Sequence, residues 1–158
     1  MHESICKGSE MMKNKVFAAL AAMALATPAL GDGFYTVDVE AEFEDVVFNV
    51  EMAITNQGLV IDDISYVGQM LERTKEDVGS DKDLFTDARI FSFCSASLSR
   101  EVMEAKLRNI QFCPYNVYVY QSAEDGAPVV VGYREFNEPT MRSINYLLQQ
   151  IVAEAAGN

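Results

Sequence analysis

Two cysteines, Cys94 and Cys113, are the residues of this sequence best suited to chemistry, and they stand 19 positions apart. In an oxidising compartment such a pair forms a structural disulfide, which for a loop of this length stabilises the fold by about 3 kcal/mol. Two other interpretations stay open. Free thiols would serve redox or sulfur-transfer chemistry, and two thiolates with a thioether would bind Cu(I).

Each alternative depends on a side chain near the cysteines. Cys94 precedes an expected helix, so helix amide groups and the nearby Arg100 would stabilise thiolates and lower their pKa. The absence of a CxxC spacing counts against a redox pair. For Cu(I), Met103 would be the third ligand, although a helical methionine more often packs in the core, here beside Leu107. We expect no cofactor otherwise.

The composition excludes several classes of function. The sole histidine is His2, which precedes the expected domain, so the domain offers no histidine for a catalytic triad, a Cys-His pair or a zinc site. No phosphate-loop or GxGxxG pattern occurs. The formal net charge of −12 and the lack of a basic stripe make nucleic acid an unsuitable partner. The acidic segment around Asp81, Asp83 and Asp87 lacks the glycine and glutamate of a calcium loop, so we interpret it as solvated.

The N-terminal segment has the pattern of a secretory signal peptide. Lys13 and Lys15 precede an apolar run over residues 16–26, and the small residues Ala29 and Gly31 suit cleavage after Gly31. This run of 11 residues is too short to cross a bilayer, and no later segment is apolar for long enough. The pattern predicts a periplasmic or secreted product with no membrane span after cleavage.

The cleavage site divides the chain into two parts. We expect residues 1–31 to be an N-terminal extension plus the signal peptide, in which Met1, Met11 and Met12 all offer a start. Residues 32–158 are long enough for one ordinary domain, and no linker or repeat divides them.

Periodic patterns predict an α+β domain with a largely antiparallel sheet and its long helices packed on one face. Strands that alternate apolar and polar residues favour antiparallel pairing, because buried parallel strands show continuous apolar runs. Strands are expected over residues 34–40, 59–66, 84–94, 115–122 and 128–136. Helices are expected over residues 43–54, 69–78 and 99–108, the last capped by Ser97 or Ser99, and from Pro139 onward.

Two helices and one strand carry informative faces. Apolar residues line one face of each long helix, at Phe43, Val46, Val47, Val50 and Ile54, and at Met141, Ile144, Leu147, Leu148, Ile151 and Val152. Tyr118 and Tyr120 share one face of their strand and could line a ligand surface, although most of the nearby aromatic residues pack within the hairpin. The candidate ligand-binding residues are therefore Arg100, Tyr115, Tyr118 and Tyr120.

The order of elements and four segments resemble the domain of unknown function 302 family. The segments are FEDVVFNVEMAITNQG, FSFCSASLSREVMEA, FCPYNVYVYQ, and an acidic-Gly hairpin leading to VVVGYREF. The resemblance covers residues 35–154 and implies a curved sheet similar to the TATA-binding protein, frequent assembly as dimers, and no established catalytic activity. This chain departs from the family pattern at Cys94-Ser95-Ala96 and at Cys113-Pro114, so the cysteines mark what is specific to its branch.

The function predicted from the sequence is that of an exported ligand-binding or accessory protein without enzymatic activity, centred on the Cys94/Cys113 region. Its partner would be a small molecule or a periplasmic protein, and it would form a homodimer. The alternative is a periplasmic protein for thiol redox chemistry, sulfur handling or Cu(I) binding.

Overall fold

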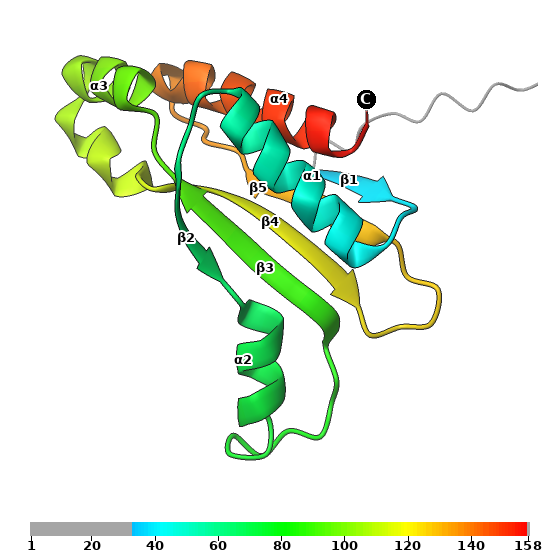
Figure 1. Ribbon diagram of the computed structural model, residues 1–158. Coiled ribbons are helices and arrows are strands. Elements are labelled where there is room, and N and C mark those ends of the chain that lie inside the picture. The colour runs from blue at the N-terminus through cyan, green and yellow to red at the C-terminus, as the bar shows by residue number, and fades with distance from the viewer. Residues whose placement is uncertain (1–32, 158) are drawn as a thin grey trace, which may run out of the picture.

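The computed structural model describes residues 33–157, which form a five-stranded antiparallel sheet with helices (Figure 1). The strand order is β1-β5-β4-β3-β2, so the first strand pairs with the last. The strands are β1 (Phe34–Val39), β2 (Ile61–Ser65), β3 (Phe85–Phe93), β4 (Tyr115–Ser122) and β5 (Val129–Arg134). The helices are α1 (Phe43–Asn56), α2 (Val67–Thr74), α3 (Ala96–Ala105) and α4 (Arg142–Ala155), with 3-10 turns η1 (Leu107–Phe112) and η2 (Pro139–Met141).

This architecture confirms the predicted α+β class and the antiparallel pairing. The predicted signal peptide, the cleavage site after Gly31 and the alternative starts lie outside the described residues.

Helices α1 and α4 lie side by side over one face of the sheet (Figure 1). Every residue predicted for their apolar faces is buried, from Phe43 to Ile54 on α1, Met141 at the end of η2, and from Ile144 to Val152 on α4. Every second residue of the central strands faces these helices: Val117 and Val119 of β4 are fully buried, as are Val129 and Val131 of β5. This shared layer of aliphatic and aromatic side chains is the hydrophobic core.

Some predicted boundaries are wrong. The N-cap of α3 is Ser95, whose hydroxyl accepts from the Leu98 amide, and not Ser97 or Ser99. This helix ends at Ala105 because the Lys106 backbone is extended, and the buried Asn109 side chain then turns back and donates to the Val102 carbonyl at 2.7 Å. Leu107 consequently begins η1 with 83% of its surface exposed and does not pack in the core.

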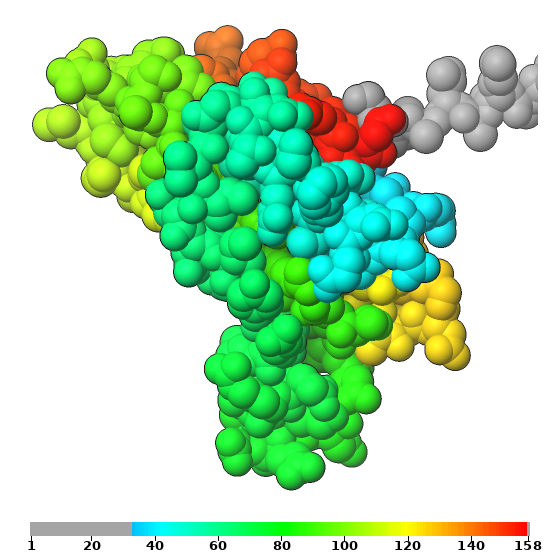
Figure 2. Space-filling view, viewed as in Figure 1, coloured from blue at the N-terminus to red at the C-terminus, as the bar shows by residue number. Residues whose placement is uncertain are grey.

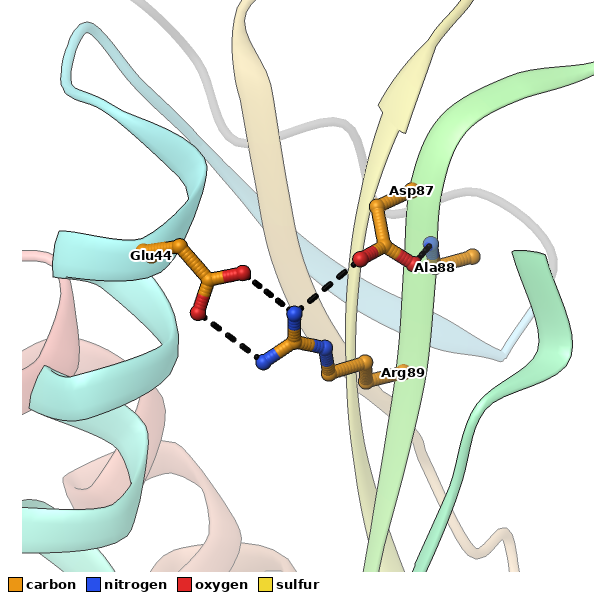
Figure 3. Close-up of polar contacts among 4 residues, drawn as sticks. All are labelled: Glu44, Asp87, Ala88 and Arg89. Atoms are coloured by element: carbon orange, nitrogen blue, oxygen red, sulfur yellow. Dashed lines mark hydrogen bonds and ion pairs between the residues drawn. The ribbon is translucent and has the colours of Figure 1, made fainter. Parts of the chain in front are cut away.

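The arginine at the centre of β3 ties the covering layer to the sheet. Arg89 donates to both carboxylate oxygens of Glu44 on α1 and to Asp87 on its own strand (Figure 3). Its guanidinium also lies over the rings of Phe43 and Tyr66, at 5.2 and 5.4 Å from their centroids. The start of α1 and the start of α2 are thus both held against β3.

Helix α2 and the loop after it project from the end of the sheet as a separate lobe (Figure 2). Gly68 allows the close approach of α2 to β3, because a Cβ at this position would lie 2.5 Å from the Ala88 nitrogen. Of the residues in α2, only Gly68 is buried, so the lobe adds little to the core. The helix spans Val67–Thr74, shorter and earlier than the predicted 69–78.

Replacement of Gly132 in β5 tests the packing across the uncovered face. A Cβ at Gly132 would lie 2.5 Å from the Tyr35 carbonyl oxygen and 2.7 Å from the Tyr118 hydroxyl. We expect Gly132→Ala to lower the free energy of unfolding by about 1–3 kcal/mol, because the backbone contact cannot move away. The control is Thr36→Ala, at the exposed residue opposite Gly132, which should change it by no more than about 0.5 kcal/mol. Equal stabilities of the two variants in urea unfolding would contradict this prediction.

Candidate functional site

The sheet face that α1 and α4 leave uncovered forms a groove of about 830 Å³. The strand register brings side chains from distant parts of the chain together on this face. Phe34 of β1 lies opposite Arg134 of β5, and Asn116 of β4 lies opposite Ser92 of β3. In the next row, Gly132 lies opposite Tyr118. We call this surface the open-face groove; its lining residues from the strands are Phe34, Ser65, Ile90, Ser92, Asn116, Tyr118 and Arg134.

One end of the groove has an aromatic wall. Phe112 of η1 and Phe136, just after β5, pack with ring centroids 4.9 Å apart, and both line the groove together with Pro114. The Asn145 side chain on α4 holds Phe136 in place, because it donates to the Phe136 carbonyl and accepts from the Phe136 amide. The wall is thus fixed to the helix layer.

One of the two cysteines, Cys113, stands in the chain between Phe112 and Pro114 of this wall. Cys94 follows β3, Cys113 precedes Pro114, and the two form a disulfide with their Cα atoms 6.6 Å apart. The prediction that both sulfurs lie at the same end of the sheet is confirmed. The disulfide closes the segment that contains α3 and η1, so it fixes where Phe112 and Pro114 can lie relative to β3.

Arg134 is the only lysine or arginine among the described residues that line the groove. Its guanidinium carbon lies 5.6 Å from the centroid of the Phe34 ring, and no carboxylate within residues 33–157 lies within 4 Å of it. By contrast, Glu138 in the same lining pairs with Lys106 and Arg108. The hydrogen bond from Lys106 holds the pKa of Glu138 below its usual range. Within the part of the chain that the structure describes, this guanidinium thus has no ion-pair partner, whereas the Glu138 carboxylate is engaged.

The floor of the groove is a tyrosine held over a glycine. The Tyr118 hydroxyl and the ring carbon that bears it lie 2.7 and 2.9 Å from where a Cβ of Gly132 would stand, so this ring crosses the neighbouring strand. Burial, with a smaller contribution from Tyr120, raises the pKa of Tyr118, so its hydroxyl stays protonated at neutral pH. Beside it, Ser92 donates to the Asn116 side-chain oxygen at 2.6 Å.

The structure brings only some of the predicted residues to this groove. Tyr118 and Tyr120 share the uncovered face, with ring centroids 6.2 Å apart, and Tyr118 lines the groove. Tyr115 lies on the opposite face, 1% exposed, where its hydroxyl bonds to Ser99 and burial raises its pKa. Arg100 is exposed on α3 and pairs with Glu104. Tyr115 and Arg100 are absent from the groove lining.

The sequence analysis missed Phe34, Asn116, Arg134 and Phe136. Three of them had a signal. Asn116 and Arg134 alternate with buried residues along their strands and Phe34 with half-buried ones, so all three must face away from the core. Their convergence depends on β1 lying beside β5, which local patterns do not reveal.

The metal predictions involve groups that are already engaged. Both cysteine sulfurs are in the disulfide and carry no thiolate, and Met103 is half-buried against the core, so the Cu(I) hypothesis requires a reduced state. No group of three or more histidine, cysteine or acidic residues that could hold a metal occurs within residues 33–157. In the acidic segment Asp83 pairs with Lys75, and Asp87 pairs with Arg89.

The fold and the groove define a one-domain α+β protein with an uncovered sheet face. The family described as Domain of unknown function DUF302 matches residues 35–157, and the chain belongs to this family. No curated protein matches it. A crystal structure of an uncharacterized conserved protein DUF302 from Bacillus stearothermophilus is similar in fold, with a TM-score of 0.61 and 20% identity, over 79% of this chain and 96% of that one. Within the described residues no helix has the length and apolarity of a membrane span.

Loss of the disulfide should lower the free energy of unfolding by an amount that depends on the length of the loop it closes. The double variant Cys94→Ser with Cys113→Ser should lose about 3 kcal/mol in the free energy of unfolding, because the cross-link no longer restricts the unfolded chain. Urea unfolding of the oxidised protein, the reduced protein and the variant measures this. The reduced protein serves as the matched control and should resemble the variant. Equal stability of all three would contradict a stapling role.

Proposed function

We propose that this protein is an exported ligand-binding protein whose site is the open-face groove. The observation that carries the proposal is the groove itself: its volume of about 830 Å³ suits a small molecule, and aromatic rings alternate in it with polar groups. The helices bury the other face, so this face is the surface left for a ligand.

Two features support export. The predicted signal peptide directs the chain out of the cytoplasm, and the Cys94–Cys113 disulfide fits an oxidising compartment. Periplasmic or secreted localisation therefore agrees with both the sequence and the covalent structure.

The polar groups of the groove suit binding more than catalysis. The Ser92 hydroxyl donates to the side-chain amide oxygen of Asn116. Because an amide oxygen is not a base, this contact does not activate the Ser92 hydroxyl as a nucleophile. Asn116 in turn donates to the Pro114 carbonyl. Such neutral hydrogen-bonding groups orient a ligand without reacting with it.

A search for ligands by NMR tests the proposal. Small molecules of varied chemistry, added to the oxidised protein, should shift the backbone amide signals of Tyr118, Gly132 and Arg134 in preference to those of α1 and α4. Tyr118→Ala should weaken binding of a hit about tenfold, because it removes the floor of the groove. The control is Tyr146→Ala, at a tyrosine 64% exposed on α4. Equal loss from both variants, or no shift in the groove with any compound, would rule the site out.

A thiol redox or sulfur-handling function is the second candidate. The observation that favours it is that both cysteines are only half-buried, with Cys94 directly before the Ser95 cap of α3, whose amide groups favour a thiolate. Equilibration with thiol buffers separates the candidates. A redox function predicts a potential above about −200 mV, and a structural disulfide one below about −300 mV. Cu(I) binding by the reduced protein belongs to this same candidate, and failure of the reduced protein to take up Cu(I) would remove it.

The homodimer implied by the family resemblance remains a prediction. The ligand-binding proposal is made for the groove of one copy of the chain.

A further inference from the structure

We propose that the ligand of the open-face groove is a flat aromatic carboxylic acid, with its carboxylate on Arg134 and its ring on Tyr118. This inference rests on the proposed function and names the ligand class of that site. It follows from the charge at one position, the ring at another, and the strand geometry that separates them.

The charge comes from Arg134. Of the described residues that line the groove, it is the only lysine or arginine, and within residues 33–157 it has no carboxylate partner. The Phe34 ring lies against the face of the Arg134 guanidinium and restricts its orientation. The N–H groups at the edge of the guanidinium remain available. A planar guanidinium held in this way matches a carboxylate with two parallel hydrogen bonds.

The ring site comes from Tyr118 and Gly132. Because residue 132 has no side chain, the Tyr118 ring can cross β5, with its hydroxyl 2.7 Å from the place of the missing Cβ. The ring is therefore supported from below by the sheet and remains half-buried, with surface left toward the groove. The nearly parallel Tyr120 ring, whose centroid is 6.2 Å from that of Tyr118, limits its tilt. A supported aromatic surface of this kind favours offset stacking with another flat ring.

The spacing of the two sites sets the size of the ligand. Gly132, under the Tyr118 ring, and Arg134 are two residues apart on β5 and point to the same face, so about 7 Å separates them. A fused two-ring acid spans this distance, with its ring over Tyr118 and its carboxylate beyond it. Phe136 follows Arg134 by two residues, so the wall formed by Phe112 and Phe136 would lie beyond the carboxylate end of this ligand.

Three probes separate charge from planarity. Naphthoate has both features, naphthamide keeps the flat ring and lacks the charge, and decalincarboxylate keeps the charge and lacks the flat ring. Each is titrated into the oxidised protein, and the dissociation constant is read from the amide signals of Tyr118, Gly132 and Arg134. We expect naphthoate to bind at least about tenfold more tightly than naphthamide, because charge-assisted hydrogen bonds are about twice as strong as neutral ones. It should bind several-fold more tightly than decalincarboxylate.

A variant of the arginine tests the assignment of the charge. Arg134→Gln should bring the affinity for naphthoate down to that for naphthamide and leave the naphthamide affinity unchanged. Arg142→Gln is the matched control, since Arg142 is an exposed arginine on α4, away from the groove lining, and its loss should change neither value. Unchanged amide spectra of both variants establish that the fold is intact.

The outcomes distinguish the ligand class from the site. Equal affinities for naphthoate and naphthamide at the groove would overturn the acid and leave the groove as a binding site. Equal affinities for naphthoate and decalincarboxylate would overturn the aromatic ring. No groove shift with any of the three probes would overturn the aromatic acid as a whole, while the broader compound search decides separately whether the groove binds ligands.

Discussion

One-sided burial of the sheet is the constraint on which the rest of this structure depends. Helices α1 and α4 cover a single face, so each strand must assign alternate residues to the core and to the uncovered side. In β4, Val117 and Val119 pack under the helices, while Asn116 and Tyr118 face the groove. A shift of one residue would exchange these sets and bury an amide without a partner, so the core that fixes the register also positions the groove residues.

The groove keeps its shape because its edges are attached to the covered side. The disulfide joins the end of β3 to the start of β4, and the Asn145 side chain holds Phe136 to α4. Arg89 joins α1 to the middle of β3 through Glu44 (Figure 3). These contacts hold the floor and the wall of the groove to the covered layer in the absence of a ligand. A preformed groove lowers the entropic cost of ordering side chains when a ligand binds.

The sequence predicts the parts of the fold that depend on local periodicity. The apolar faces of α1 and α4 and the shared face of Tyr118 and Tyr120 follow from periods of 3.6 and 2 residues, and all are found. The prediction is wrong at the end of α3, where the Lys106 backbone becomes extended and the Asn109 side chain bonds back to Val102. Local sequence patterns do not predict the pairing of Phe34 with Arg134. These residues are 100 positions apart and come together only because β1 and β5 are neighbours in the sheet.

The acidity of the chain and an arginine in the groove act over different distances. The net charge of −12 disfavours the approach of any anion, but salt screens this repulsion beyond about 8 Å at physiological ionic strength. Contact with Arg134 is shorter than that and is screened much less. An anionic ligand would therefore gain little from the general field of the protein and most of its selectivity from one guanidinium, whose orientation is restricted by Phe34. Selectivity for the proposed ligand would depend on its fit to Arg134, and not on the overall charge of the protein.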